Sequence, residues 1–435
     1  MAMAMADSMT ARSATMRSTA SRRGGAGRKM EAERHRREAS RGSRLELRTV
    51  SSIAEVDSEE WNRCAEGSGQ TNPFLSHEFL SALEESGSAS RETGWLPSHA
   101  VLSREGSGGE VLGVCPLYLK GHSYGEYVFD HSWANAYGRL TGKRYYPKLQ
   151  SCVPFSPVTG TRLLAKAGEG REEVLGMLST SLVTIADEME GVSGLHITFN
   201  TREELSHLSK DQGYLPRCGI QYHWENNGYE TFDDFLMTLR QSKRKTIRQE
   251  RKCAAKNDLT ISRAFGSEIK AKDWDEFYGF YLNTCDAKWG EAYLNREFFH
   301  RIGETLGDKV MVVFVEDAFG EKVAGALNLV GSDTLFGRNW GCKRGFHVKN
   351  LHFETCYYQA VEAAIEMKLS RVEAGAQGEH KIQRGYLPTL TYSTHYIKDP
   401  RFRMVVENFL KEEKHQIDYT LDVLRQELSP YKAAA

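Results

Sequence analysis

The side chains best suited to chemistry are gathered just after a short predicted strand at residues 371–375. They comprise carboxylates, an amide, an imidazole and two cations: Glu373, Gln377, Glu379, His380, Lys381 and Arg384. Acyl transfer to an amine requires a base for the nucleophile, a donor for the oxyanion and an acid for the leaving group. Polar groups concentrated where a strand leaves a sheet are typical of such sites. We expect Glu373 or Glu379 to be the base, with His380 as the alternative.

The same stretch has a simpler interpretation. Residues 375–385 begin and end with glycine. The segment is then a solvated loop without a catalytic role, and its glycines serve only to turn the chain. If the loop is a site, Lys381 and Arg384 are expected to bind an anionic donor or acceptor, and Gln377 to contact substrate.

A second candidate lies on the strand predicted at 334–342. Arg338 and Trp340 are flanked by Gly337 and Gly341, a spacing that permits a β-bulge and frees a backbone N–H for a carbonyl oxygen. The alternative is a packed tryptophan beside a surface arginine.

Two further groups are candidates for binding. A helix in the middle of the chain repeats arginine every three or four residues, at Arg240, Arg244, Arg248 and Arg251. This face is suited to the phosphates of tRNA or CoA, although a solvated helix face is the commoner explanation. In the first half, an aromatic and polar strip lines a substrate cleft or buries aromatic area, and His131 is its candidate substrate contact. The strip consists of His122, Tyr124, Tyr127, Asp130, His131, Trp133, Asn135 and Tyr137.

Neither the histidines nor the cysteines form a recognisable metal site. His347 and His352 lack the H-E-x-x-H pattern, and the eight cysteines contain no C-x-x-C pair. We therefore expect no bound metal, and free thiols in a reducing compartment.

The first 44 residues differ from the rest in composition. Residues 1–50 carry twelve basic and five acidic side chains, and Asp7 is the only acid before Glu31. The richness in Ala, Ser, Met and Arg predicts a disordered transit peptide over 1–44, for the chloroplast or alternatively the mitochondrion. The alternative is a basic tail without an address. No apolar run reaches the ~20 residues that span a bilayer, so we expect a soluble protein.

The predicted elements of the second half place the candidate groups together. One long helix is predicted over 229–257, and further helices over 272–283 and 295–305. Three strands then follow at 309–317, 322–331 and 334–342, with connections short enough for hairpins. A helix over 354–368, a strand at 371–375 and a final helix over 401–428 complete the half. This order predicts a half-parallel sheet in which the N-terminus of the crossover helix points into the gap between separating parallel strands, a natural site for a carbonyl or a phosphate.

The first half is predicted to mix short strands and helices. Strands are expected from residue 45, as a pair over 110–121, and at 195–199. Helices are expected from Ser76 as N-cap and over 171–189.

Several stretches of the sequence resemble one family. FETCYYQAVEAAIEMKLSRVEAGAQGEHKIQRGYLPTLTYSTH at 353–395 is similar to the signature block of FemAB-like proteins, within the superfamily of GNAT acyltransferases. Residues 72–87, 115–137 and 242–252 match as well. The resemblance implies an α+β fold of tandem GNAT-like domains with mixed sheets flanked by helices, over 45–225 and 226–435. FemABX proteins transfer amino acids from aminoacyl-tRNA to a peptidoglycan precursor.

The resemblance implies N-acyl transfer from acyl-CoA or aminoacyl-tRNA to a small-molecule or peptide amine. The glycine-spaced pyrophosphate loop of acetyl-CoA enzymes is replaced here by GCKRGFHVKNLHF, in which Lys343, Arg344 and Lys349 are the candidate cofactor contacts. We expect no tightly bound cofactor, with acyl-CoA as a candidate co-substrate. The alternative function is a non-catalytic module that recognises a ligand on a degenerate GNAT fold.

Overall fold

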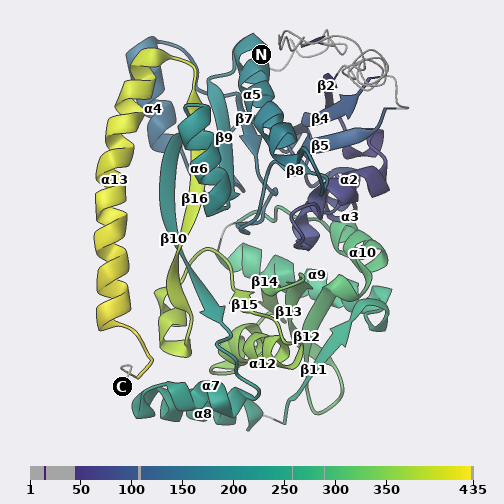
Figure 1. Cartoon of the computed structure of the whole chain (residues 1–435). Coiled ribbons are helices and arrows are strands. Elements are labelled where there is room, and N and C mark those ends of the chain that lie inside the picture. The colour runs from purple at the N-terminus through teal and green to yellow at the C-terminus, as the bar shows by residue number, and fades with distance from the viewer. Residues whose placement is uncertain (1–13, 16–44, 106–108, 257, 289, 433–435) are drawn as a thin grey trace, which may run out of the picture.

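The computed structural model describes residues 14–15, 45–105, 109–256, 258–288 and 290–432 (Figure 1). These residues form an α+β fold of two sheets flanked by helices, as predicted. The large sheet has the order β11 Thr260–Phe265, β12 Val310–Glu316, β13 Lys322–Val330, β14 Thr334–Cys342, β15 Arg371–Glu373, β10 Leu215–Glu225, β16 Leu387–Ile397, β9 Gly194–Asn200, β7 Lys148–Ser151, β6 Tyr118–Lys120 and β3 Trp95–Pro97. The small sheet has the order β1 Ala14–Thr15, β2 Leu45–Val50, β4 His99–Arg104, β5 Val111–Cys115 and β8 Leu164–Ala165.

Helices cover both sheets. They are α2 Ser58–Ala65, α3 His77–Glu85, α4 His131–Thr141, α5 Arg171–Glu188, α6 Arg202–Asp211, α7 Phe232–Thr238, α8 Gln241–Ala255, α9 Ala271–Lys288, α10 Arg296–Thr305, α11 Leu351–Phe353, α12 Gln359–Glu366 and α13 Pro400–Glu427. In the part of the chain that the structure covers, no helix is both long and apolar enough to cross a membrane. The predicted transit peptide, 1–44, lies outside the described residues except for Ala14–Thr15, which pair with β2.

The strand order predicted for the second half is confirmed. β12, β13 and β14 form antiparallel hairpins, and the crossover helix returns the chain to β15, which runs parallel to β14. This crossover helix spans α11 and α12, joined by a π-helical segment at Glu354–Tyr358. Its apolar stripe is buried as predicted at Tyr357, Ala360, Val361, Ala364 and Ile365.

The first half contains the same unit. β6 and β7 are antiparallel, α5 crosses over, and β9 returns parallel to β7. Each half therefore contains one pair of parallel neighbours joined by a helix, which is the arrangement expected of tandem GNAT-like units.

The two halves exchange strands. β10 closes the first half in sequence but pairs with β15 at its carboxyl end, whereas β16 returns from the second half to pair with β9. β10 and β16 pair with each other from Leu215↔His395 to His223↔Leu387. The large sheet is thus continuous across the predicted boundary at 225/226, and α13 packs along both exchanged strands (Figure 1).

Some sequence predictions were wrong. The long helix predicted over 229–257 is two helices, α7 and α8. Its N-terminal cap at Thr231 is correct, but Leu239 is extended, fully buried and bridged to Tyr431. Burial of this leucine against the C-terminal segment outweighs the helix propensity of its neighbours. The pair predicted over 110–121 is divided between the two sheets, with Pro116 between β5 and β6.

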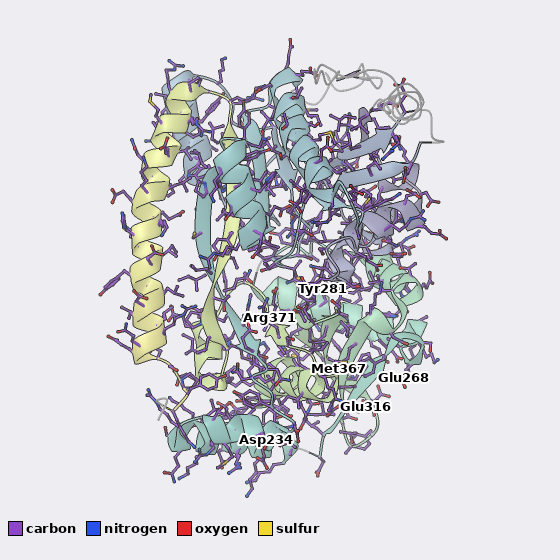
Figure 2. All side chains as sticks on the ribbon, in the orientation of Figure 1. Asp234, Glu268, Tyr281, Glu316, Met367 and Arg371 are labelled. Atoms are coloured by element: carbon purple, nitrogen blue, oxygen red, sulfur yellow. The ribbon has the colours of Figure 1, made fainter. Side chains whose placement is uncertain are left out.

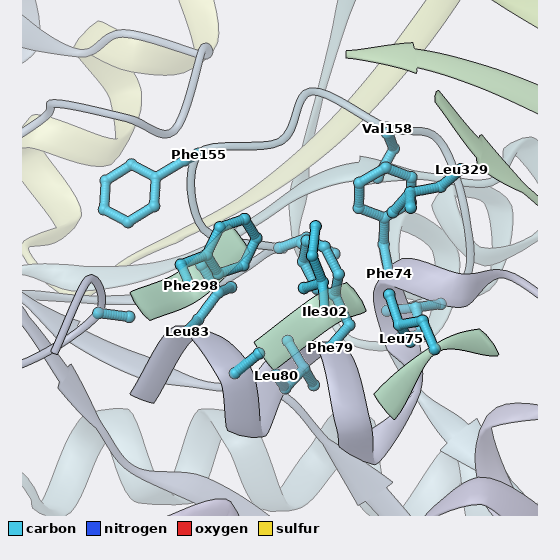
Figure 3. Packing of buried hydrophobic residues seen from close by; sticks show 14 of the residues in the cluster. Phe74, Leu75, Phe79, Leu80, Leu83, Phe155, Val158, Phe298, Ile302 and Leu329 are labelled. Carbon is cyan, nitrogen blue, oxygen red and sulfur yellow. The ribbon is translucent and has the colours of Figure 1, made fainter. Parts of the chain in front are cut away.

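One apolar cluster is shared by both halves. The 3-10 turn Pro73–Leu75 contributes Phe74 and α3 contributes Phe79, whose ring packs against Phe298 of α10 (Figure 3). Phe74 in turn packs against Phe336 of β14. The rings of Phe74 and Phe336 cross edge to face at 5.3 Å between centroids. Because this cluster buries side chains from both halves, neither half retains its full core without the other.

The shared cluster leads to a testable expectation. Phe74→Ala should lower the free energy of unfolding by about 3–5 kcal/mol, because it leaves a cavity under both halves. Urea denaturation of the full chain, followed by tryptophan fluorescence and circular dichroism, should still show one transition. Phe319→Ala is the matched control, since Phe319 is 92% exposed. Two separate transitions would show that the halves do not share a cooperative core.

Candidate active site

The gap predicted between parallel strands is present. β14 and β15 pair in parallel from Thr334↔Arg371 to Phe336↔Glu373, and beyond these residues they are no longer paired. Arg371, labelled in Figure 2, begins β15. It forms an ion pair with Glu225 at the end of β10, with 2.8 Å between Nε and Oε1. Glu373, the last residue of β15, thus lies where the sheet opens.

The predicted bulge in β14 is confirmed. Asn328 pairs with Gly337 and Ala326 with Trp340, so β14 has two residues opposite Leu327. Gly341 has a different role from the one expected. A Cβ at this position would overlap the carbonyl oxygen of Phe280, so the glycine lets α9 approach the sheet closely.

Glu373 is buried with few partners. The Thr159 N–H donates to its Oε2 at 3.4 Å, and His223 Nε2 lies 3.9 Å from its Oε1. Burial raises the pKa of this carboxyl to about 7, while burial lowers the pKa of His223 to about 3. Glu373 is therefore poised to exchange a proton near neutral pH, next to a neutral imidazole.

A loop of the first half crosses this opening. We call residues 153–162 the junction loop. Arg338 Nη2 donates to the Phe155 carbonyl at 2.8 Å, and Gln221 Nε2 donates to the Pro157 carbonyl at 2.9 Å. The junction loop therefore joins the bulge, β10 and the end of β15.

Arg162 anchors the end of the junction loop. Its guanidinium is buried and donates to the carbonyls of Val158, Gly160, Thr161 and Thr198. The four carbonyl oxygens fix the guanidinium of Arg162 in place. Its positive charge acts on Glu373, but the two side chains do not form an ion pair.

Backbone strain is concentrated around the same opening. Six non-glycine residues in the described segments have positive φ, and three of them are aromatic residues at this junction: Tyr127, Phe155 and Phe199. Tyr127 interacts with the Arg338 guanidinium, and Phe199 accepts from the Gly160 N–H at 3.0 Å. Unfavourable conformations of this kind persist at functional sites, where the surrounding structure enforces them.

A polar layer extends from Glu373 across one face of the large sheet. Residues paired across neighbouring strands share a face. The buried members of this layer are Lys120, Lys148, Gln150, His196, Thr198, Gln221, His223, Thr391, Ser393 and His395. α5 and α6 cover the opposite face with apolar side chains.

The centre of this layer is a chain of hydrogen bonds. The Nδ1 atoms of His196 and His395 lie 2.8 Å apart, His395 Nε2 lies 3.1 Å from the Ser393 hydroxyl, and His196 Nε2 lies 3.0 Å from the Tyr145 hydroxyl. Tyr145 donates to Asp130 at 3.0 Å. Burial lowers the pKa of both histidines, to about 3 for His196. With both rings neutral, Ser393 donates to His395, His395 to His196 and His196 to Tyr145, so that every member is satisfied.

A cavity of about 1430 Å³ is lined mainly by residues of the first half, and Glu291, Ala292 and Tyr293 of the second half complete its lining. Residues of the predicted aromatic strip line it, namely His122, Tyr124 and Asn135, together with Tyr293 from the second half. Phe155 stacks on Tyr293 at 5.1 Å between centroids and also lines a smaller cavity beside Arg338 and Asn339. Neither cavity is lined by a residue of the 375–385 loop.

The loop itself divides into exposed and buried groups. Gln377, Glu379 and His380 are exposed, and His380 Nε2 lies 3.0 Å from the Tyr357 hydroxyl. Lys381 is buried and donates to the carbonyls of Ala374 at 2.5 Å and Gly375 at 3.1 Å. Burial lowers its pKa to about 8.

Arg384 is held within the protein. It forms an ion pair with Glu250 of α8 at 2.7 Å, donates to the His380 carbonyl, and lies 3.4 Å above the Phe353 ring. These contacts fix the loop against α8 and the crossover helix.

The other predicted binding residues are scattered. Trp340 packs edge to face on His352, and His131 is exposed at the start of α4, stacked on Phe129. Lys343, Arg344 and Lys349 are exposed on the loop before the crossover helix, where Lys343 lies 3.7 Å from Glu321 and Arg344 3.6 Å from Asp286.

The arginines of the basic helix already have partners. Arg251 pairs with Glu354 and Glu362, and Arg248 pairs with Asp233. Arg240 and Arg244 donate to the backbone carbonyls of Tyr431 and Leu239. These contacts attach α8 to the fold and offset part of the charge expected on its face.

Sequence reasoning missed most of the polar layer. Seven of its ten members lie on β7, β10 and β16, none of which was predicted as a strand. The signal was available in the alternation of polar residues in LHITF and TLTYSTH, which places His196 and Thr198, and then Thr391, Ser393 and His395, on one face.

Comparison with known proteins identifies relatives of this fold. The FemAB-like family model, described as peptidoglycan biosynthesis/recognition, matches residues 52–433. No curated protein matches the chain. The solved structure of FemX is 12% identical, with a TM-score of 0.48 over 81% of this chain and 98% of FemX. The C-terminal domain of a putative lysylphosphatidylglycerol synthetase from Agrobacterium fabrum is 12% identical, with a TM-score of 0.49 over 86% of this chain and 98% of that one. A GCN5-related N-acetyltransferase from Sphaerobacter thermophilus is 11% identical, with a TM-score of 0.32 over 81% and 95%.

The environment of Glu373 predicts how stability changes with pH. Its pKa is about 7 in the folded chain against an ordinary value of 4.5. Between about pH 4.5 and pH 7, the folded state therefore keeps the Glu373 proton, whereas the unfolded state has lost it. The stabilisation is complete below pH 4.5 and lost as the pH rises through 7, a change on the order of 3 kcal/mol. The buried histidines, whose pKa values are lowered, change the stability of the wild type and of Glu373→Gln alike over this range. Urea denaturation between about pH 5 and pH 8 should therefore show the wild type losing stability relative to Glu373→Gln as the pH rises. Equal pH slopes for the two proteins would contradict the assignment.

Proposed function

The chain belongs to the FemAB-like family, and we propose that it transfers an acyl or aminoacyl group from an activated donor to an amine acceptor. The observation that carries this proposal is the Glu373 carboxyl, buried where β14 and β15 separate and holding a pKa of about 7. A base with this pKa is half ionised at neutral pH and takes a proton efficiently from an attacking amine.

The reaction follows from the groups at the opening. The amine nitrogen bonds to the carbonyl carbon of an ester or thioester, and Glu373 accepts the proton that the nitrogen loses. The bond from carbon to the leaving oxygen or sulfur then breaks, and the leaving group takes up the proton that Glu373 received, which returns Glu373 to its ionised form. Arg338, on the bulge, lies close enough to Glu373 to lower its pKa and supplies positive charge where the oxyanion forms.

The junction loop regulates access in this proposal. Glu373 is 4% exposed, and the Thr159 N–H and the Phe155 carbonyl connect the loop to both sides of the opening. Substrates reach Glu373 when this loop moves away from the opening. When the loop is closed, it excludes water from the site between turnovers.

Replacement of the base tests the proposal. Glu373→Gln should lower kcat/KM by about 10²–10⁴-fold, because it removes the proton acceptor and preserves the size of the side chain. The wild-type rate should rise with pH up to about 7 and then level off. The assay uses acetyl-CoA or aminoacyl-tRNA with a panel of primary amines, and measures thiol release or transfer of radiolabel.

The matched control is Glu188→Gln, since Glu188 is exposed at the end of α5. Loss of activity in Glu379→Gln together with full activity in Glu373→Gln would show that Glu379, in the 375–385 loop, is the base and Glu373 is not. Ligand binding without turnover for every donor would support the non-catalytic module instead.

The donor is tested separately by binding. Thermal stabilisation of the full chain by CoA supports an acyl-CoA donor, with Lys343, Arg344 and Lys349 as its contacts. Binding of tRNA that weakens steeply between about 50 and 200 mM salt supports an aminoacyl-tRNA donor. Lys245→Ala and Lys252→Ala, both exposed on α8, should weaken tRNA binding without loss of stability.

A further inference from the structure

Helix α13 has one buried face and one exposed face. The buried face packs on β10 and β16, and Figure 1 shows the helix along the outer edge of the molecule. The exposed face carries four large apolar or aromatic side chains: Met404, Val405, Phe409 and Tyr419. Single exposed residues of this kind are ordinary, but four of them on one helix indicate a surface for another molecule.

The centre of the exposed face is a symmetrical row of residues, which we call the outer stripe. With about 3.6 residues per turn, its members fall within about 100° of arc, opposite the buried apolar residues of the helix. Four of them precede its midpoint, at Arg401, Met404, Asn408 and Lys411. Four follow the midpoint, at Glu412, His415, Tyr419 and Asp422. On both sides the steps are three, four and three residues, so the stripe has the same spacing when it is read from either end.

The charges of the outer stripe are complementary to its own reverse. A second copy of α13 that lies antiparallel on the first, with the two midpoints aligned, brings Arg401 opposite Asp422 and Lys411 opposite Glu412. A two-fold axis repeats each contact, so both ion pairs form twice. Steps of three and four residues are also the spacing at which two helices pack along their length.

The uncharged members of the stripe match in the same alignment. Met404 faces Tyr419, which brings a thioether against an aromatic ring, and Asn408 faces His415, with which it can share a hydrogen bond. A parallel pair in register would instead bring each Arg401 against its own copy, and these like charges repel. The sequence of the stripe therefore favours the antiparallel arrangement.

Contacts within the chain leave the basic members of the stripe accessible. Arg401 lies 3.4 Å from Asp399, and Lys411 lies 2.9 Å from Glu407. The side chains of Arg401 and Lys411 are nevertheless 66% and 63% exposed. Ion pairs at such exposed positions contribute little to stability, so a carboxylate of a second copy competes with them.

We propose that α13 is a self-association surface, through which two copies of this chain pair antiparallel along the outer stripe. The helix has 28 residues and is therefore about 42 Å long. A contact between two single helices is small beside the interface of a permanent dimer, so we expect a dissociation constant on the order of micromolar. The inference does not depend on the proposed transfer reaction, in which no residue of the stripe takes part.

Charge reversal with rescue tests the pairing. Sedimentation velocity of the full chain between about 1 and 100 µM should show a monomer–dimer equilibrium that added salt weakens. Arg401→Glu or Asp422→Arg alone should raise the dissociation constant by about tenfold or more, because each brings like charges together at both copies of the contact. The double variant, with Arg401→Glu and Asp422→Arg, should return the dissociation constant to the wild-type value.

The rescue separates association from effects within one chain. Residues 401 and 422 lie about 32 Å apart along the helix, well beyond the Debye length of about 8 Å, so their charges interact only between copies. The matched control is Arg202→Glu, at the start of α6 on the opposite face of the sheet, which should leave the dissociation constant unchanged.

A second pair of substitutions repeats the test where a charge reversal lowers the thermal midpoint. Met404→Lys and Tyr419→Glu replace side chains that are 61% and 73% exposed, so the fold tolerates both. Each substitution alone should weaken the dimer, and the two together should restore it through a new ion pair.

Sedimentation as a monomer up to about 100 µM would overturn this assignment. A double variant that dimerises no better than the single variants would overturn it as well, because the antiparallel alignment requires the rescue. Flotation of a monomeric chain with vesicles of anionic lipid would assign the outer stripe to a membrane surface in place of a second copy.

Discussion

The pairing of β10 with β16 is the constraint on which the rest of the structure depends. These two long strands join the halves through one uninterrupted ladder, and each then pairs with a strand of the other half. His223 reaches Glu373 because β10 lies between β15 and β16 in the sheet, so that His223 is paired with Leu387 on one side and with Glu373 on the other. A shift of this ladder by one residue would turn the polar layer away from its partners and would bury apolar side chains in its place.

The contacts within that layer explain how the sheet retains so many buried polar groups. Lys148 is fully buried but is held by two carboxyls, and the two histidines remain neutral and complete a chain of donors and acceptors. Burial acts to raise the pKa of Asp130, but Lys148 and His196 lower it well below its usual range. Glu373 lies at the far end of the layer and lacks such support, which is why its pKa rises instead.

Local signals in the sequence were sufficient for most elements. Caps at Ser76 and Thr231, the stripe of the crossover helix and the hairpins of β12 to β14 were all predicted, because each depends on neighbouring residues. The break at Leu239 and the exchange of β10 and β16 depend on partners more than a hundred residues away, which no local pattern encodes. The candidate site was found only in part for the same reason. Glu373 and Arg338 were named from the sequence, but the junction loop that joins them comes from the first half.

The reciprocal exchange of β10 and β16 also bears on how such a chain originates. A lone unit with one crossover helix would leave the strand beside that crossover, β9 or β15, unpaired along one edge. Two identical units that traded their last strands would cover both exposed edges at once, as in a domain-swapped homodimer. The present chain has the geometry of that dimer with its subunits fused head to tail, so gene duplication followed by fusion is a sufficient route to its architecture.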